Sequence, residues 1–308
     1  MDPYPKQRQL IDAALAKGAN VPVSLGYGGS RGAAKSRLLR DLALVVISEI
    51  PRLLPGIVIY IVRQVWGDLY QNHVQEFEHE HPELMGWFFN GNQEKAFRFP
   101  SEMGGGKIVF AYGDTFKDLR RFTRGPQAYM VLIDQAEAFT EDELIELNTP
   151  NRWPNAQAGE VKTVHAYNPG GPGCLYLDRI YVRGEYNLRE NPEHFMFVQG
   201  FGWDNWCWIS TQGIMLDGRP LDRETYYTLP GDLPPCPNGI YDERWLASIP
   251  DNHRMKLFVT QTAEGRKMWA KPDAIRMGEL FGRFDAFAGQ AFSGVWNKQR
   301  LVIGGMGA

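Results

Sequence analysis

The sequence predicts an α/β fold, in which a mostly parallel sheet is flanked by helices and followed by a smaller, irregular lid or linker part. Short apolar and β-branched runs alternate with helical patterns up to about residue 170, which is typical of parallel α/β proteins. Beyond that point the chain is rich in aromatic residues, glycine and proline, and the alternation is lost. The 308 residues suffice to bury a full core, and the formal net charge of −3 provides no global basic field for nucleic acid.

Five apolar runs are expected to form the strands of this sheet, and they lie at residues 21–25, 57–62, 108–111, 129–133 and 161–167. The second and fourth runs are almost continuously apolar, which is typical of strands buried on both faces. Between the first two runs, apolar residues from Leu38 to Val46 recur at helical spacing, and Pro51 ends this predicted helix. Two short helices are expected further on, at 241–249 and 251–257.

The strongest chemical signal is the segment GGSRGAAKS at 28–36, which follows a predicted strand and opens a predicted helix. Small residues let backbone N–H groups point inward to phosphate oxygens, and the start of the helix adds partial positive charge. Lys35 would contact the β- and γ-phosphates of ATP, and the Ser36 hydroxyl would bind Mg²⁺. The other predicted ATP-binding residues of this phosphate loop are Gly29, Ser30, Gly32, Ala33 and Ala34.

Ala34 departs from the usual phosphate-loop pattern, which has glycine before the lysine. We expect its methyl group to be accommodated if the backbone at this position is helical. The alternative is a glycine-rich turn that carries Lys35 and Ser36 by chance. The strand before the turn and the helix after it favour the phosphate loop.

A second apolar strand ends in Asp134, which is the form of a Walker B strand, and Asp134 would hold Mg²⁺ together with Ser36. The next residue is Gln135. ATPases with an extra strand between the two Walker strands usually carry glutamate there, as the catalytic residue that activates water. Glutamine can hold a water but cannot accept its proton, and losing a general base typically costs about 10²–10⁴ in rate. We therefore expect ATP binding with very slow hydrolysis, because glutamate was replaced to trap ATP or because a natural variant uses another base, such as Glu137.

A basic cluster lies shortly before this strand and includes Arg124. Arg124 is a candidate arginine finger, acting on the ATP of its own chain or of a neighbouring subunit, and Arg31 in the phosphate loop is its rival. An arginine finger contributes about 10³–10⁵ to turnover. The simpler interpretation of the cluster is a solvated helix face.

Three histidines, His73, His79 and His81, lie in an acidic stretch, but their spacing fits no zinc site. We expect them at the end of a surface helix. Further along, Thr140 and Glu143 have the spacing of a capping box that opens a short acidic helix.

Together these segments resemble the ATPase domain of the large terminase subunit, the DNA-packaging motor of tailed bacteriophages. The resemblance rests on the phosphate loop, on IDQAE at 133–137 in place of the family's IDEAE, and on HAYNP at 165–169, which is similar to the family's coupling motif. It implies that Gln7 reads the adenine and that Asn168 couples loss of the γ-phosphate to movement. Weaker similarities lie at 61–63, 106–110, 124–125, 204–205 and 289–292.

The resemblance implies a P-loop NTPase fold with ATP and Mg²⁺ as cofactors, and a motor that drives double-stranded DNA into a procapsid. The implied partners are DNA, the portal protein and the small terminase subunit, with a ring of copies on the portal and a monomer as the alternative in isolation. No membrane partner is expected, and the implied location is the host cell cytoplasm. Three widely spaced cysteines without a CxxC pattern favour reduced thiols, which agrees with that location.

The expected organisation is an ATPase core at 1–235, a lid or linker subdomain at 236–280, and at 281–308 the start of a linker towards the family's nuclease domain. That domain holds two metal ions with carboxylates, and we find no later set of Asp and Glu residues suited to this. Nuclease activity is therefore not expected from this chain.

Two other functions remain open. A DNA helicase or similar translocase would need a second RecA-like domain, but residues 171–308 show no strand–helix alternation. A nucleotide-dependent binding module, which clamps a partner when loaded with ATP and does not hydrolyse it, would agree with Gln135.

Overall fold

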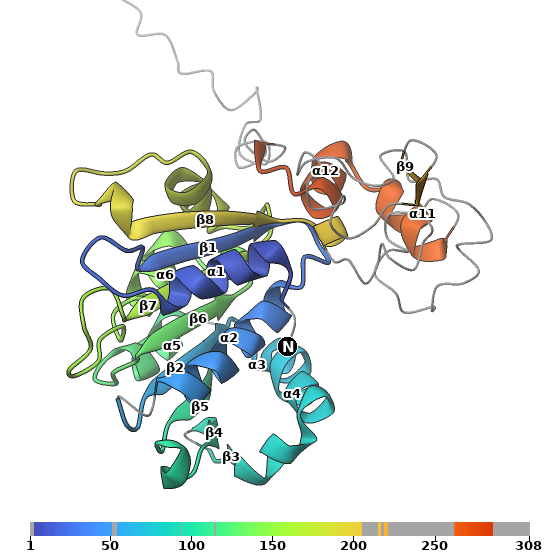
Figure 1. Ribbon diagram of the computed structural model, residues 1–308. Helices are drawn as coiled ribbons and strands as arrows, with labels where there is room; N and C mark the ends of the chain where they lie inside the picture. The colour runs from blue at the N-terminus through green and yellow to red at the C-terminus, as the bar shows by residue number, and fades with distance from the viewer. Residues whose placement is uncertain are drawn as a thin grey trace, which may run out of the picture.

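An eight-stranded sheet forms the centre of the structure, a computed structural model that describes residues 3–50, 54–92, 94–113, 115–204, 215–216, 219–220 and 262–285. All neighbouring strands from β5 to β8 pair in parallel, and β3 and β4 are added antiparallel at one edge. The predicted, mostly parallel sheet is therefore confirmed (Figure 1). In order across the sheet, the strands are β3 (Phe88–Asn90), β4 (Lys95–Arg98), β5 (Lys107–Tyr112), β2 (Val58–Arg63), β6 (Met130–Asp134), β7 (Lys162–Tyr167), β1 (Ser24–Gly29) and β8 (Phe195–Gly200).

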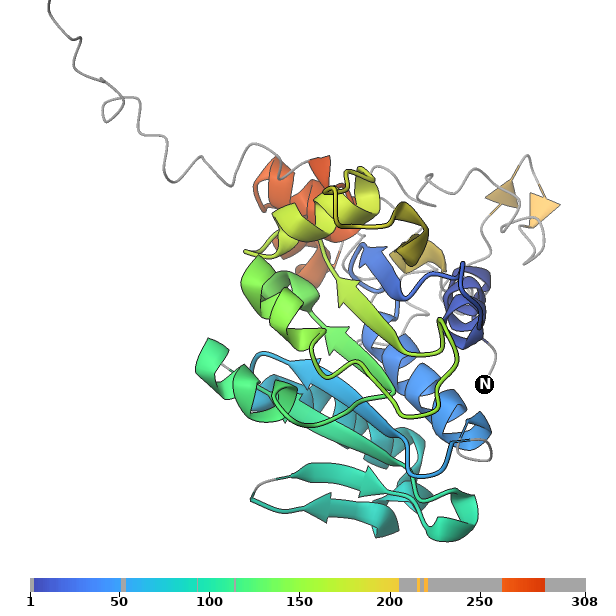
Figure 2. The same ribbon diagram turned by 90° about the vertical axis from the view of Figure 1, so that its left-hand side faces the viewer.

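Helices cover both faces of the sheet, as Figure 2 shows. On one face lie α1 (Pro5–Leu15), α2 (Lys35–Glu49), α3 (Trp66–Leu69) and α4 (Gln75–Glu80), with a π-helical turn at Tyr70–Val74 between the last two. On the other face lie α5 (Phe116–Thr123), α6 (Glu141–Leu147) and α7 (Cys174–Leu177), which continues into a π-helical turn at Asp178–Val182. Short 3-10 helices lie at Pro82–Trp87, Ser101–Met103, Ala136–Ala138, Pro192–His194 and Gly202–Asp204.

The described residues beyond these elements form the antiparallel pair β9 (Met215–Leu216) and β10 (Arg219–Pro220), and the helices α11 (Ala263–Trp269) and α12 (Asp273–Phe281). The helices predicted at 241–249 and 251–257, the boundary predicted at 235 and the segment 289–292 lie outside the described residues. The boundary predicted at 280 falls inside α12. Among the described helices, none is long and apolar enough to cross a membrane.

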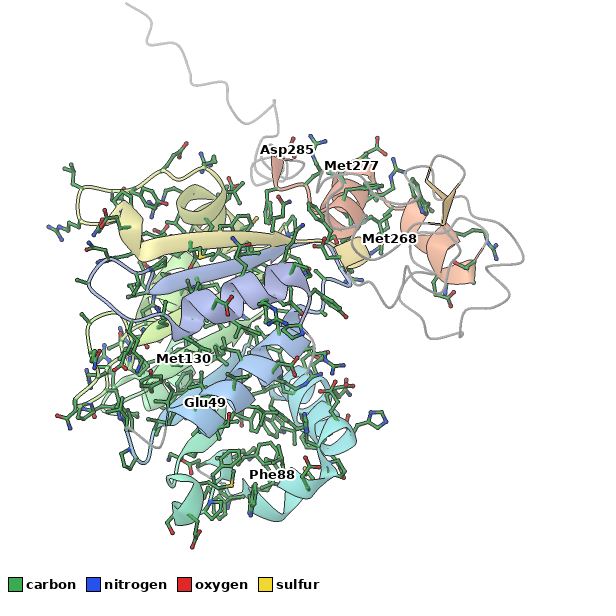
Figure 3. The ribbon with its side chains drawn as sticks, in the orientation of Figure 1. Glu49, Phe88, Met130, Met268, Met277 and Asp285 are labelled. Atoms are coloured by element: carbon green, nitrogen blue, oxygen red, sulfur yellow. The ribbon has the colours of Figure 1, made fainter. Side chains whose placement is uncertain are left out.

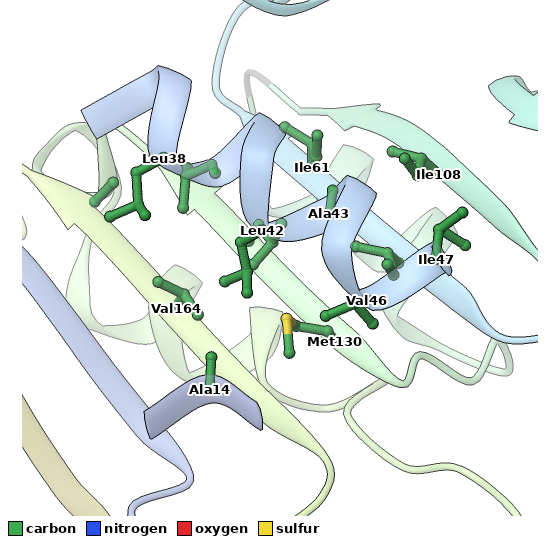
Figure 4. Packing of buried hydrophobic residues seen from close by; sticks show 14 of the residues in the cluster. Ala14, Leu38, Leu42, Ala43, Val46, Ile47, Ile61, Ile108, Met130 and Val164 are labelled. Atoms are coloured by element: carbon green, nitrogen blue, oxygen red, sulfur yellow. The ribbon is translucent and has the colours of Figure 1, made fainter. Parts of the chain in front are cut away.

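The packing of α2 on the sheet shows how the apolar pattern forms the core. Leu38, Leu42 and Val46 recur every four residues, so they lie on one face of the helix. They pack in one cluster with Met130 of β6 and Val164 of β7, all fully buried (Figure 4). Burial of each Leu or Val side chain stabilises the fold by about 1.5–3 kcal/mol. This packing fixes the start of α2, and with it the phosphate loop, against the sheet.

Four of the five predicted strands coincide with β2, β5, β6 and β7 to within a residue or two, but the first prediction was misplaced. The strand expected at 21–25 is β1, Ser24–Gly29, which runs on into the glycines. The glycines are required because a Cβ at Gly26 would lie 2.8 Å from the ring of Tyr181, and one at Gly28 would lie as close to Tyr167. Glycine, which lowers strand propensity in sequence, is selected here by close packing of aromatic rings.

The order of the central strands places three strand ends side by side. β7 lies between β1, which leads into the phosphate loop, and β6, which ends in Asp134. The three strands are parallel, so their carboxyl ends meet at one edge of the sheet, where ligands of open α/β sheets bind. The strand β8, which the sequence did not predict, pairs with β1 on its other side. Residues after 170 therefore contribute to the main sheet.

Candidate nucleotide-binding site

The phosphate loop connects the end of β1 to the start of α2, as predicted. Lys35 begins the helix, and its amino group donates hydrogen bonds to the carbonyl oxygens of Gly29 at 3.3 Å and Ser30 at 2.5 Å. Burial lowers the pKa of Lys35 to about 8, while the carboxylates of Glu137 and Asp134 act in the opposite direction. The ammonium therefore stays largely protonated at neutral pH and is directed at the rim of the loop.

Ala34 has φ 54° and ψ 36°, which is the left-handed helical region. The expectation of ordinary helical dihedrals at this position was therefore wrong. The left-handed conformation brings Cβ close to a carbonyl oxygen and costs roughly 1–2 kcal/mol for a residue with a side chain. This geometry explains why glycine is usual at this position of a phosphate loop.

Substitution of Ala34 by glycine is expected to raise the free energy of unfolding by about 0.5–1 kcal/mol, because relief of the left-handed strain outweighs the extra chain entropy of glycine. Urea unfolding measures the change. The matched control is Ala13→Gly in the right-handed helix α1, which should lower stability by about 1 kcal/mol. Equal destabilisation by the two substitutions would contradict the left-handed geometry.

Ser36 and Asp134 meet across the loop, as predicted for a shared metal site. The Ser36 hydroxyl donates a hydrogen bond to Asp134 Oδ2 at 3.0 Å, and Asp134 is almost fully buried. Burial would raise the pKa of Asp134, but hydrogen bonds from His73 and Ser36 and the charge of Arg63 hold it below its usual value. One hydroxyl and one ionised carboxylate are the hard oxygen ligands that Mg²⁺ prefers. The two side chains therefore fit a shared Mg²⁺ ion.

His73 contacts the same carboxylate, which corrects the expectation that it lies at the end of a surface helix. It is fully buried on the π-helical turn after α3, with Nε2 3.0 Å from Asp134 Oδ2. Because a carboxylate only accepts, Nε2 carries the proton, and burial lowers the pKa of His73 so that the ring is neutral. His79 is exposed, and the described residues contain no cluster of three or more metal-ligating side chains.

Arg63 also reaches this carboxylate and was missed by the sequence reasoning. It ends β2, next to β6, and its Nε lies 3.4 Å from Asp134 Oδ2. The available signal was a charged residue at the carboxyl end of a buried strand. For His73 no comparable signal exists, because the extra residue of a π-helical turn redirects side chains that a regular helix would leave outside.

Gln135 follows Asp134 and also has left-handed dihedrals, with φ 53° and ψ 49°. Two residues later, Glu137 lies on the 3-10 turn at 136–138 and accepts a hydrogen bond from Asn168 Nδ2 at 2.9 Å on Oε1. Asn168 directly follows β7, between the phosphate loop and the Walker B strand. Burial raises the pKa of Glu137, although Asn168 and the charge of Lys35 act to lower it. The predicted coupling residue is therefore joined to a carboxylate that faces Lys35.

Gln7 lies behind the phosphate loop, on the first turn of α1. Its side chain is buried, and Nε2 donates to the carbonyl oxygen of Ala34 at 3.4 Å. Its Oε1 accepts a hydrogen bond from the backbone N–H of Tyr4 at 3.1 Å. The structure thus brings Gln7 to the loop, and recognition of adenine by its amide stays a prediction.

The two candidate arginines lie at opposite edges of the sheet. Arg31 is in the phosphate loop, whereas Arg124 ends α5 and precedes β6, with its Nε 3.6 Å from Glu146 Oε1. Asp134 is at the far end of that five-residue strand, so about 17 Å of strand separates the two edges. The structure therefore contradicts a finger role for Arg124 on the ATP of its own chain. A role on the ATP of a neighbouring subunit stays a prediction.

Helix α12 is seated on the phosphate loop, a contact that the sequence did not predict (Figure 1). The backbone N–H of Arg31 donates to the carbonyl oxygen of Glu279 at 2.7 Å, and the Arg31 Nε lies 3.5 Å from the Glu279 carboxylate. Gly282, just past the helix, packs so closely that a Cβ would lie 2.8 Å from the Ser30 nitrogen. Gln199 of β8 donates to the Gly282 carbonyl at 3.0 Å. The lid segment and the loop are thus in direct contact.

The fold and the arrangement of these residues are those of a P-loop NTPase with an extra strand between the two Walker strands. The large terminase of a thermophilic bacteriophage has a similar fold, both in its complex with ADP (TM-score 0.52, 11% identity, 92% of this chain and 54% of that chain) and in its complex with ATP-γ-S (TM-score 0.52, 11%, 92% and 53%). The HK97 bacteriophage large terminase matches over 64% of this chain and 39% of its own, with TM-score 0.44 and 14% identity.

The chain therefore has the fold seen in phage large terminases, and it spans about half the length of the solved protein from the thermophilic bacteriophage. At these identities the similarity concerns the fold. Comparison with protein-family models and with curated protein sequences gives no match.

Proposed function

We propose that this chain is the ATPase motor part of a viral DNA-packaging terminase, which hydrolyses ATP to move double-stranded DNA into a procapsid. The observation that carries the proposal is the meeting of Ser36 and Asp134 at 3.0 Å, beside the buried ammonium of Lys35 and at the edge where three parallel strands end. The terminase of the thermophilic bacteriophage, which shares the fold, was solved with ADP and with ATP-γ-S.

In this proposal, Ser36 and Asp134 hold Mg²⁺, which would neutralise charge on the β- and γ-phosphates. Lys35 leaves the carbonyl groups of Gly29 and Ser30 and binds the same phosphates. Backbone N–H groups of the loop orient the phosphate chain, and Gln7 fixes the loop from behind through Ala34. Asn168 lies where loss of the γ-phosphate would be sensed, and its bond to Glu137 would change at that step.

Gln135 is proposed to slow this hydrolysis, because an amide can orient the attacking water but cannot take its proton. The same residue favours a second candidate function, a nucleotide-dependent binding module that loads ATP and releases its partner only when ATP dissociates. The partners proposed for the motor are duplex DNA, the portal protein and the small terminase subunit, in a ring of copies within the host cell cytoplasm.

Duplex DNA is expected to raise the rate of phosphate release from ATP severalfold at about 50 mM salt, and the increase should be lost near 200 mM. The physical reason is the net charge of −3, which leaves only local basic patches to hold the DNA backbone. Phosphate release is measured with linear duplex and with single-stranded DNA of equal length. Equal stimulation by both would favour a helicase, and strong, salt-resistant duplex binding would contradict the weak-grip motor.

A further inference from the structure

Glu137 is held rigidly at the carboxyl edge of the sheet. The backbone N–H of Gly173 donates to its carbonyl oxygen at 3.0 Å, and Gly171 approaches the same oxygen so closely that any side chain there would clash. The 3-10 turn that carries Glu137 follows directly on β6 and Asp134. The direction of the Glu137 side chain is thus set by backbone contacts on both sides of the site.

The carboxylate of Glu137 has one oxygen satisfied and one free. Oε1 accepts from Asn168, but Oε2 is buried and has no hydrogen-bond partner among the described residues. A buried carboxylate oxygen without a partner is unfavourable by several kcal/mol, so such groups are normally bonded to protein or to water. The opposite charge nearest to it, that of Lys35, belongs to the phosphate loop. An acceptor is therefore open towards the space where the γ-phosphate would lie.

We propose that Glu137, and not Gln135, accepts the proton of the attacking water in this chain, with Asn168 as the positioning residue that holds its other oxygen. The inference rests on the proposed ATPase function. The water oxygen forms a bond to the γ-phosphorus while the bond from that phosphorus to the β-phosphate oxygen breaks. ADP leaves with the electron pair of the broken bond, and the water proton passes to Glu137 Oε2 and then to solvent.

Two further observations favour Glu137 over its neighbour. Burial raises the pKa of Glu137 towards neutrality, which is the range in which a general base works best, whereas an amide has no basicity. Glu137 is also the carboxylate that contacts Asn168, so occupancy of the γ-phosphate position can be linked to the state of the base through one hydrogen bond. Catalysis through Glu137 explains how a chain with Gln135 could retain slow turnover.

The test is the isosteric substitution Glu137→Gln in the full chain, with Mg²⁺–ATP as the probe. Single-turnover phosphate release should fall by about 10² or more, while the ATP dissociation constant changes by less than about threefold. Glu49→Gln is the matched control, because Glu49 is exposed at the end of α2 remote from the phosphate loop and should leave both quantities unchanged (Figure 3).

A double variant, Glu137→Gln with Gln135→Glu, separates loss of the base from loss of structure. Recovery of turnover to the level of the single variant Gln135→Glu supports proton acceptance by Glu137. Three results would overturn it: wild-type turnover in Glu137→Gln, a double variant that stays inactive, or a wild-type chain that binds ATP without any turnover. Failure of the wild-type chain to bind ATP is distinguishable from all three, because it removes the proposed function itself.

Discussion

Substitution of Lys35 by alanine is expected to weaken ATP binding by at least about 100-fold, equivalent to roughly 2.8 kcal/mol. The ammonium is the cation that the phosphate loop provides, and charge-assisted contacts with phosphate are roughly twice as strong as neutral hydrogen bonds. In the structure its Nζ lies at the carbonyl oxygens of Gly29 and Ser30, already within the loop. Titration with a fluorescent ATP analogue measures the loss.

Loss of fold is not expected to explain the result. Burial lowers the pKa of Lys35 to about 8, so keeping it protonated at neutral pH costs folding free energy, and alanine removes this cost. The matched control is Lys117→Ala on α5, an exposed residue whose removal should leave the ATP dissociation constant unchanged. Unchanged ATP affinity in Lys35→Ala would contradict the assignment of the phosphate loop.

Substitution of Gln135 by glutamate is expected to raise ATP turnover at least about tenfold, because it restores a carboxylate directly after Asp134. Glutamate and glutamine have nearly the same shape, so the left-handed backbone at this position is equally tolerable for both. The measurement is steady-state phosphate release at saturating Mg²⁺–ATP.

The matched control for this gain is Gln127→Glu, an exposed position before β6 at the opposite edge of the sheet, where the same charge should leave turnover unchanged. A gain would support the motor. Absence of any gain would favour the nucleotide-dependent binding module.

The residues that the sequence located correctly are those whose chemistry is encoded locally. The phosphate loop needs only a strand, small residues and the start of a helix, and Asp134 needs only an apolar run before it. Thr140 likewise caps α6 with Glu143, as its spacing predicted. Signals of this kind survive folding because they depend on neighbours within a few residues.

The missed features depend on contacts between distant segments. His73 reaches Asp134 across sixty-one positions of sequence, and only the packed π-helical turn brings it there. Strand β8 was hidden because its run is short and lies among glycines and prolines, and it is stabilised by pairing with β1. Tertiary contacts of this kind override local propensity and leave no periodic signature.

The contact between α12 and the phosphate loop has a mechanical consequence. Its main bond joins one peptide group to another, the Arg31 N–H to the Glu279 carbonyl, so substitution of either side chain leaves the joint in place. A helix of nine residues is a rod about 14 Å long. Any tilt of the loop's peptide planes as phosphates arrive or depart is therefore applied to one end of this rod and magnified at the other. The chain has a lever whose fulcrum is the nucleotide pocket.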